Sequence, residues 1–255
     1  MSSSTWFDGA VALVTGGGAG FGRAIALSLA TQGAKIAVVD RSLPGASETA
    51  ALVQAAGGTA LAVHANVTDA AQVQAMVAQT VQHFGGLNFA VNNAGIEGDV
   101  FVPVADYSQA TWDAVLGVNL KGVFLSMKYE LPHIVARKGA IVNMASVAGL
   151  SGGRMGSAYY ASKHGVVGLT KAAAMEYADK GVRINAVAPG VIHTDMAERA
   201  FLRTAAVAPR VDAMHPLGRM GTAQEVANAV VWLCSSNASF ITGHTLPVDG
   251  GFLVP

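Results

Sequence analysis

The sequence contains a single cysteine, Cys234, among its 255 residues. One cysteine cannot form an internal disulfide or a cluster of thiolate metal ligands. It lies in the apolar run AVVWLC (residues 229–234), which predicts a buried and unreactive thiol. The seven histidines are scattered, without the HExxH spacing of a zinc-binding helix. The sequence therefore predicts no metal site.

Charged residues are also scarce, at 13% of the chain, and 16 basic residues balance 16 acidic ones. Without a basic excess we expect neither a nucleic-acid partner nor an anionic membrane surface as a partner. No uninterrupted apolar stretch reaches the roughly 18 residues that a membrane-spanning helix needs. The first residues, MSSSTWFDG, lack the basic and apolar segments of a signal peptide. We therefore expect a cytoplasmic protein with no membrane partner.

Apolar strands, glycine or polar breaks and amphipathic helices alternate along the chain. Strands are expected at residues 10–16, 35–40, 59–67, 87–95, 139–146, 182–190 and 244–251. Helices are expected at residues 20–33, 47–58, 69–84, 108–136, 157–180 and 222–236. This order predicts one α/β domain over residues 1–255, a Rossmann-type doubly wound parallel sheet of about seven strands with helices on both faces. The stretch 191–217 is too long for an ordinary connection, and we expect it to be a substrate-binding lid.

The first expected strand runs into a glycine-rich turn, TGGGAGFG (residues 15–22), that leads into a helix. Glycines let the backbone approach a pyrophosphate, which the helix N-terminus stabilises. The spacing differs from the common GxGxxG motif, so the turn alone leaves a merely tight turn as an alternative. Asp40 ends the second strand, about 20 residues further on, where a carboxylate can accept hydrogen bonds from a ribose. Asp40 can also cap the turn-like residues 41–44, but the complete order of elements favours a dinucleotide.

Tyr159 and Lys163 are four residues apart and are therefore neighbours on one helical face. A neighbouring ammonium favours a phenolate, so we expect Lys163 to lower the pKa of Tyr159 from the value of about 10 of a free phenol. Ser146 lies at the carboxyl end of the fifth strand, where its hydroxyl and that of Tyr159 can converge on one substrate oxygen. From the pair alone, an ordinary surface pair on a helix is the preferred interpretation, and Tyr160 is a competing candidate.

Together these motifs resemble the short-chain dehydrogenase/reductase family in its single-domain form. The likeness extends from about Phe7 to Phe252, and the motifs occur in the family's order: TGGGAGFG (15–22), NNAG (92–95), Asn119 in VNLKG, Ser146, YYASK (159–163), PGVIHT (189–194) and PVDGG (247–251). The resemblance implies an oxidoreductase that moves a hydride between a nicotinamide and an alcohol or ketone carbon.

The resemblance also implies four catalytic residues. Ser146 would hold the substrate oxygen and Tyr159 would transfer its proton. Lys163 would bind the nicotinamide ribose and tune Tyr159, and Asn119 would hold a water that links Lys163 to bulk solvent.

A larger set of residues is implied to bind the cofactor. They are Gly16, Gly20, Phe21 and Gly22 along the pyrophosphate, Asp40 at the ribose, Asn66, Val67 and Asn93 on the adenosine side, Ile192 and Thr194 at the carboxamide, and Tyr159 and Lys163. Phe21 replaces the usual isoleucine, which leaves its backbone amide unaffected. Asn66 replaces a frequent aspartate, and we expect this change to loosen adenine binding slightly.

The leading interpretation is an enzyme that interconverts a secondary alcohol and a ketone with NAD(H), since Asp40 would repel the 2′-phosphate of NADP. We expect a small or medium-sized, mostly apolar and cyclic substrate, because apolar residues recur in 191–217 and residues 149–155 offer little bulk. Arg154, between Ser146 and Tyr159, leaves an anionic substrate group as a minority alternative. The family resemblance and the apolar fraction of 52% predict a homotetramer.

There are three other interpretations, of which the first is also an enzyme and the other two belong to different classes. An NADP(H)-dependent reductase of carrier-bound 3-ketoacyl groups is disfavoured by Asp40, although Arg41 could turn toward a 2′-phosphate. A dinucleotide-sensing regulator without catalysis would be free to lose Ser146, Tyr159 or Lys163, and all three are present. A purely structural interaction protein would gain nothing from the glycine turn, which carries a stability cost.

Overall fold

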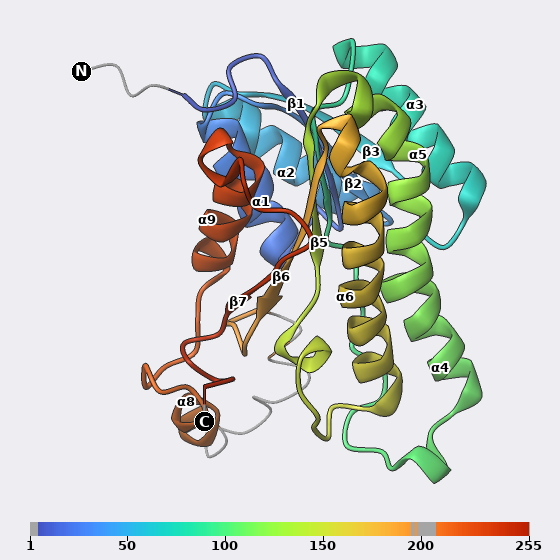
Figure 1. The fold of residues 1–255 in the computed structure, drawn as a ribbon, viewed down its shortest axis with the longest axis vertical. Coiled ribbons are helices and arrows are strands. Elements are labelled where there is room, and N and C mark those ends of the chain that lie inside the picture. The colour runs from blue at the N-terminus through green and yellow to red at the C-terminus, as the bar shows by residue number, and fades with distance from the viewer. Residues whose placement is uncertain (1–4, 195–196, 198–207, 255) are drawn as a thin grey trace.

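The computed structural model describes residues 5–194, 197 and 208–254, and its strands form one sheet (Figure 1). All seven strands are parallel, in the order β3-β2-β1-β4-β5-β6-β7. They are β1 (Val11–Thr15), β2 (Lys35–Asp40), β3 (Thr59–His64), β4 (Phe89–Asn92), β5 (Ala140–Met144), β6 (Arg183–Pro189) and β7 (Thr245–Val248). This sheet confirms the predicted fold class.

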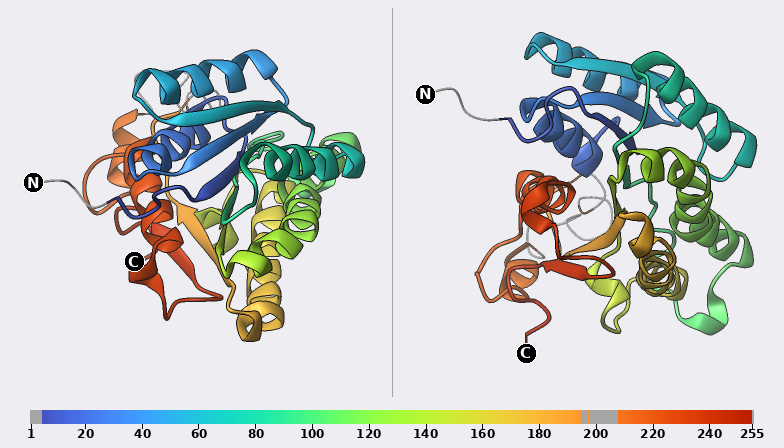
Figure 2. Two further views of the ribbon diagram at one scale, coloured as in Figure 1. Left: turned by 90° about the horizontal axis from the view of Figure 1, so that it is seen from above. Right: turned by 45° about the horizontal axis from the view of Figure 1, so that its top comes forward.

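Helices cover both faces of the sheet (Figure 2). One face carries α1 (Gly20–Thr31), α2 (Leu43–Ala55) and α9 (Ala223–Cys234), and the other carries α3 (Ala70–Phe84), α5 (Gly122–Arg137) and α6 (Ser157–Tyr177). The remaining helical segments are α4 (Gln109–Leu116), α8 (Ala208–Ala213), η1 (Val104–Asp106), η2 (Gly117–Lys121), η3 (Val147–Gly149), η4 (Ala178–Lys180) and η5 (Ser236–Ala238). Among the described helices, none combines the length and the apolar character needed to cross a membrane.

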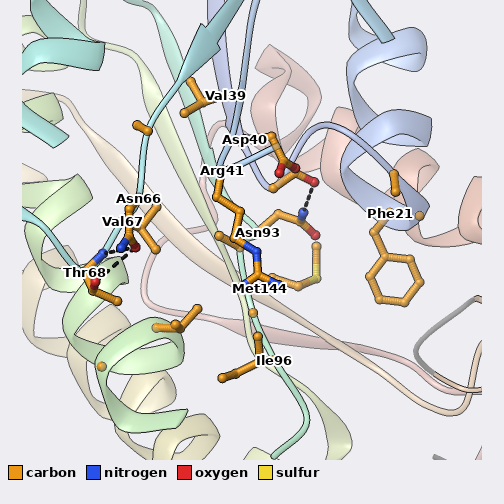
Figure 3. Close-up of a pocket in the computed structure, with 18 of the residues that line it drawn as sticks. Phe21, Val39, Asp40, Arg41, Asn66, Val67, Thr68, Asn93, Ile96 and Met144 are labelled. Carbon is orange, nitrogen blue, oxygen red and sulfur yellow. Dashed lines mark hydrogen bonds between the residues drawn. The ribbon is translucent and has the colours of Figure 1, made fainter. Parts of the chain in front are cut away.

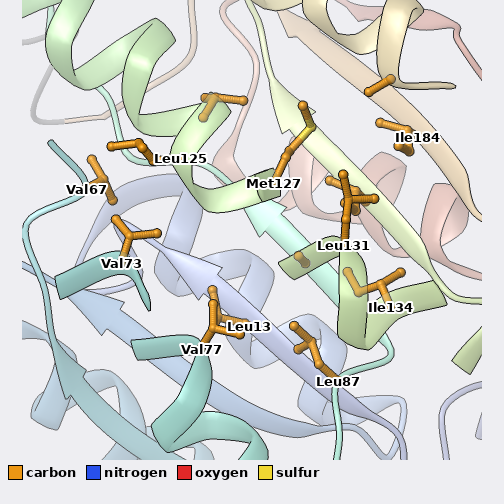
Figure 4. Packing of buried hydrophobic residues seen from close by; sticks show 14 of the residues in the cluster. Leu13, Val67, Val73, Val77, Leu87, Leu125, Met127, Leu131, Ile134 and Ile184 are labelled. Atoms are coloured by element: carbon orange, nitrogen blue, oxygen red, sulfur yellow. The ribbon is translucent and has the colours of Figure 1, made fainter. Parts of the chain in front are cut away.

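Successive side chains of a strand point to opposite faces of the sheet. Because helices cover both faces, the inner strands are apolar on both sides. In β1, Leu13 packs with the α3, α5 and α6 layer, whereas Val14 packs with the α1, α2 and α9 layer, and both are fully buried. Figure 4 shows the first layer, in which Val77 of α3 and Ile134 of α5 approach the sheet. This double burial explains why β1 reads as a continuous apolar run.

The prediction that the second helix begins at residue 47 is wrong, because α2 begins at Leu43. Ser42 caps the helix with its hydroxyl, which accepts a hydrogen bond from the Gly45 amide at 3.3 Å. Pro44 occupies the first turn, where its missing N–H has no intrahelical partner to lose. Serine and proline thus start a helix where their composition suggested a turn.

The expected helix at 108–136 is three segments, α4, η2 and α5, of which η2 has π-helical hydrogen bonding. The wider turn places Asn119 in the interior, where it is fully buried. Such π-helical turns inside α-helices are frequent at functional sites.

The chain order of the strands reverses between β1 and β4, which is the position where open parallel sheets bind their ligands. Side chains tie the two strand ends together there. The Thr15 hydroxyl accepts hydrogen bonds from the amides of Asn93 at 3.0 Å and Ala94 at 3.2 Å. The Asn93 side-chain amide donates to the Thr15 carbonyl at 3.0 Å. The glycine turn and the NNAG segment therefore form one rigid edge.

Candidate active site

A pocket of about 920 Å³ opens at the carboxyl ends of the strands, beside the reversal point (Figure 3). Most of the predicted site residues line it: Gly16, Gly20, Phe21, Asp40, Asn66, Val67, Asn93, Tyr159, Lys163 and Thr194. The fold therefore gathers into one cavity residues that are spread from position 16 to position 194.

The other predicted site residues lie just behind the pocket wall. Gly22 packs so closely on the Gly16 carbonyl that a Cβ there would collide with it. Ile192 is buried and forms an isolated parallel bridge with Gly221. Ser146 and Asn119 both contact the helix that carries Tyr159, as described below.

The glycine turn presents bare backbone to the pocket. Gly16 has φ +63, and a Cβ on it would lie 2.9 Å from the Cα atom of Ala94, so both the conformation and the space require glycine. The N-cap of α1, Ala19, offers no side-chain hydrogen bond to the first helical turn. The free amides of this turn are donors suited to an anionic pyrophosphate. These features fit a dinucleotide.

Asp40 caps the turn, as one interpretation of the sequence predicts, and it also lines the pocket. Its Oδ1 accepts from the Ser42 amide at 2.8 Å and caps the turn, while its Oδ2 accepts from the Gly18 amide at 2.9 Å. Arg23 binds the other backbone group of the same residue by donating to the Gly18 carbonyl at 2.7 Å. A carboxylate oxygen can accept more than one hydrogen bond. Asp40 is therefore held in place at the pocket wall with capacity left for a ribose.

The far end of the pocket is lined by polar residues that follow β2 and β3. The Asn66 side-chain oxygen accepts from the Thr68 amide at 3.1 Å and from the Thr68 hydroxyl at 3.0 Å. Arg41 also lines this end, and its side chain is directed into the pocket in Figure 3. Sequence analysis missed several lining residues: His64, Thr68, Gln72, Ile96, Asp113 and Met144. The available signal was their position, at the end of a strand, just after one, or on α3 or α4.

Tyr159 and Lys163 form the other end of the pocket and are both buried, with exposed fractions of 9% and 4%. The Lys163 ammonium lies 5.6 Å from the centroid of the Tyr159 ring. The Ser146 hydroxyl hydrogen-bonds the hydroxyl of Tyr159. Tyr160 does not line the pocket, and its hydroxyl packs against Gly153 instead. The geometry favours Tyr159 over Tyr160.

The expectation that Lys163 lowers the pKa of Tyr159 is wrong in this structure. Burial raises the pKa of Tyr159, the hydrogen bond from Ser146 lowers it, and the charge of Glu97 raises it further. Burial also lowers the pKa of Lys163 to about 8. The physical reason is that desolvation disfavours both charged forms. In addition, the ammonium donates at 2.8 Å to the Met144 carbonyl.

Asn119 connects the loop after β4 to α6. Its side chain brackets Ile96, accepting from the Ile96 amide at 2.8 Å and donating to the Ile96 carbonyl at 2.9 Å. It also donates to the Ser162 hydroxyl at 3.2 Å, which in turn donates to the Tyr159 carbonyl at 2.8 Å. Sequence analysis did not single out Ser162, although it lies within YYASK. The water expected at Asn119 stays a prediction.

The segment 191–217, expected to be a lid, is described in part. His215 connects the beginning of the segment to its last part. Its ring accepts a hydrogen bond from the Val191 amide at 3.1 Å and is hydrogen-bonded to the Val211 carbonyl at 2.9 Å. Val211 is buried and Met214 is 49% exposed. The other apolar residues on which the lid prediction rested lie outside the described residues: Met196, Phe201, Leu202 and Val207.

Cys234 is buried, as expected, and burial raises its pKa to about 12. A thiol with so high a pKa is protonated at neutral pH and is a poor nucleophile. Within the described ranges, no three side chains of histidine, cysteine, aspartate or glutamate gather into a metal site.

Residues 16–253 match a family model described as enoyl-(acyl carrier protein) reductase. Cyclohexanol dehydrogenase of Acinetobacter sp. (strain SE19) is 46% identical over 250 residues, which cover 98% of this chain and 97% of that protein. Levodione reductase of Leifsonia aquatica is 43% identical over 258 residues, covering 98% and 96% of the two chains. A 3-oxoacyl-[acyl-carrier-protein] reductase of Staphylococcus aureus (strain Mu50 / ATCC 700699) is 41% identical over 245 residues, covering 94% and 96%.

Solved structures agree along almost the whole chain. A crystal structure of levodione reductase superimposes with a TM-score of 0.93 at 41% identity and covers 96% of this chain and 98% of its own. A short-chain type dehydrogenase/reductase from Mycobacterium marinum gives a TM-score of 0.92 at 33% identity, covering 99% and 98%.

Proposed function

Because the chain belongs to the short-chain dehydrogenase/reductase family, we propose that it interconverts a secondary alcohol and a ketone, with Tyr159 as the acid/base. The observation that carries this proposal is the cluster at the inner end of the pocket. There the Tyr159 hydroxyl, hydrogen-bonded to Ser146, lies on the same helix as the buried Lys163. A bound nicotinamide dinucleotide would supply the hydride acceptor for oxidation and the hydride donor for reduction.

The residues of the chain handle the substrate oxygen and its proton. In oxidation, Tyr159 accepts the hydroxyl proton as the C–H bond of the alcohol gives up its hydride; in reduction it returns that proton to the oxygen. Ser146 holds the same oxygen by a hydrogen bond. Lys163 would bind the nicotinamide ribose. The hydrogen bonds from Asn119 to Ser162 and from Ser162 to the Tyr159 carbonyl fix the backbone that carries Tyr159.

We propose NAD(H) as the cofactor. Asp40 supports this choice because its carboxylate is held at the pocket wall by Gly18 and Ser42 and cannot easily turn away. A 2′-phosphate placed against it would meet a fixed negative charge. Arg41 is the residue that could offset this repulsion, so the NADP-dependent 3-ketoacyl-carrier reductase is the second candidate.

We propose a cyclic secondary alcohol or cyclic ketone as the substrate. Two relatives of high identity are named for cyclohexanol and for levodione, and their names support a ring-shaped substrate here. Arg154 is exposed and does not line the described pocket.

A substrate panel tests the proposed function. Cyclohexanol, a linear secondary alcohol of equal carbon count and a hydroxy acid are compared by kcat/KM, each with NAD and with NADP. The expected result is turnover with NAD that is highest for the ring. No turnover with any alcohol would favour the dinucleotide-sensing regulator. A preference for the hydroxy acid that collapses in Arg154→Ala, but not in the exposed-charge control Arg137→Ala, would make Arg154 a carboxylate anchor.

We further propose a homotetramer. Large apolar side chains lie exposed on the two long helices, with Phe124 of α5 at 47% and Met175 of α6 at 83%. Phe240, before β7, is fully exposed. These exposed apolar side chains are the candidate contacts between subunits. The expected cytoplasmic location stays a prediction.

A further inference from the structure

A chain of buried polar side chains lies behind the catalytic edge, between the sheet and helices α5 and α6. Asn92 ends β4 and is the direct neighbour of Asn143 in β5. The Asn92 amide donates at 3.1 Å to Glu130 Oε2 and at 3.0 Å to the side-chain oxygen of Asn143. The Asn143 amide donates at 3.0 Å to the Thr170 hydroxyl of α6. None of these four side chains contacts the pocket.

Glu130 is fully buried on the face of α5 that packs on the sheet. Its helical neighbours Met127, Leu131 and Ile134 form an apolar layer there (Figure 4). An ionised carboxylate in such surroundings is strongly disfavoured unless a cation pairs with it. Lys163, a buried cation on the adjacent α6, is instead held by the Met144 carbonyl.

Two buried acceptor atoms in this chain have no hydrogen-bond partner, Glu130 Oε1 and Asn92 Oδ1. The two side chains that carry these atoms are already joined by one hydrogen bond, from the Asn92 amide to Glu130 Oε2. A carboxylate would leave both as unsatisfied acceptors, which is costly in the interior. One proton on Oε1 would satisfy both, because it would make Oε1 a donor to Oδ1.

We propose that Glu130 is a protonated acid at neutral pH that forms a cyclic pair with the Asn92 amide and acts as a positioning residue for the active site. In this pair the amide N–H donates to Oε2 and the acid O–H donates to Oδ1. Both amide hydrogens of Asn92 are then engaged, which fixes its orientation toward Asn143.

The pair acts on the site through the chain, since both asparagines adjoin site residues. Asn93, next after Asn92, holds the carbonyls of Thr15 and Gly16. Met144, next after Asn143, accepts from the Lys163 ammonium. A carboxylate at Glu130 would repel the Asn92 oxygen and disturb both strand ends.

The sign of the pH dependence follows from the protonated form. Burial raises the pKa of Glu130 from 4.5 to about 8, and the hydrogen bond from Asn92 lowers it. The side chains that reach the pair from β4, β5 and α6 are Asn92, Asn143 and Thr170, all uncharged. On its own helix, Lys128 is exposed and lies over the Tyr129 ring, and the exposed His83 belongs to the far end of α3. The stabilisation of the fold by protonated Glu130 is therefore complete below the pKa of this side chain in the unfolded chain, and it is lost as the pH rises through about 8.

Infrared difference spectroscopy on the full-length protein tests the protonation directly. At neutral pH, wild type minus Glu130→Gln should show the carbonyl band of a protonated carboxylic acid. Wild type minus Glu176→Gln, an exposed carboxylate on α6, should not. A spectrum without the protonated band would overturn the proposal, and so would a band that survives in Glu130→Gln.

Two substitutions separate the positioning role from simple packing. Gln can rebuild the cyclic pair, since its amide donates to Oδ1 and its carbonyl accepts from the Asn92 amide, whereas Met fills similar space without polar atoms. We expect the NADH dissociation constant of Glu130→Gln to match wild type and that of Glu130→Met to rise several-fold. The unfolding equilibrium constant of wild type should increase by up to about tenfold per pH unit between pH 5 and 8 relative to Glu130→Gln. Equal NADH binding in both variants, or equal pH slopes in wild type and Glu130→Gln, would refute the positioning role.

Discussion

Cofactor choice offers the sharpest test of the site, because the proposed preference for NAD rests on a single carboxylate, that of Asp40. A 2′-phosphate bound about 4 Å from Asp40 would be repelled by about 4 kcal/mol at an effective dielectric near 20. Each 1.4 kcal/mol corresponds to about a factor of ten, so the upper limit is a preference for NAD of about a thousandfold. Arg41 faces the same space and offsets part of the repulsion. We therefore expect a ratio of kcat/KM between some tens and about a thousand in favour of NAD.

Asp40→Ala should reduce this ratio to less than about tenfold, since the charge is gone and Arg41 remains. The variant also loses the two hydrogen bonds to Gly18 and Ser42, so its melting temperature should fall slightly. Asp179→Ala, an exposed carboxylate on η4, changes the net charge equally and should leave the ratio unaltered. The reasoning fails if wild type prefers NADP, or if Asp40→Ala keeps the wild-type ratio.

Three further predictions concern catalysis and assembly. Tyr159→Phe should lower kcat by a factor of about 10² to 10⁴ or more, while the affinity for NADH, measured by fluorescence, stays close to that of wild type. The control Tyr160→Phe should keep most of its activity. If Tyr160→Phe loses activity and Tyr159→Phe keeps it, Tyr160 is the acid/base. The rate of alcohol oxidation, where chemistry limits it, should rise between about pH 6 and about pH 9, since the base is deprotonated Tyr159 and burial raises its pKa; a flat profile would contradict this role. Light scattering at micromolar concentration should give a tetramer, and a mass near the 25.9 kDa of one chain would disprove it.

The fold could be predicted from the sequence because its signals are local and repeated. The inner strands are apolar runs that are largely buried on both faces, and most of the described helices follow a glycine or a capping residue. The start of α2 was misplaced because Ser42 and Pro44 favour a turn and the first turn of a helix equally. The π-helical turn around Asn119 has no compositional signature, since its geometry depends on what the side chain bonds.

The site was predictable as far as its residues follow strand ends or share a helix face. Asp40 and Asn93 follow the first rule, and Tyr159 and Lys163 follow the second. Ser162 was missed because a serine in mid-helix is ordinary, and its role exists only through Asn119, 43 residues away. His64 and Gln72 were missed because they line the pocket without a motif of their own.

Charge states proved least predictable, because burial sets them and spacing does not. The interval from Tyr159 to Lys163 predicted a lowered tyrosine pKa, yet burial raises the pKa of that tyrosine and lowers the pKa of the lysine. Glu130 gives the same lesson on the same face of the sheet, where an acid conventionally assigned a negative charge lies in an apolar layer. Both cases have one cause: the free energy of a buried charge depends on every group packed around it. The Lys163 ammonium donates a hydrogen bond to the Met144 carbonyl, and Met144 follows Asn143 in the buried polar chain that ends at Glu130.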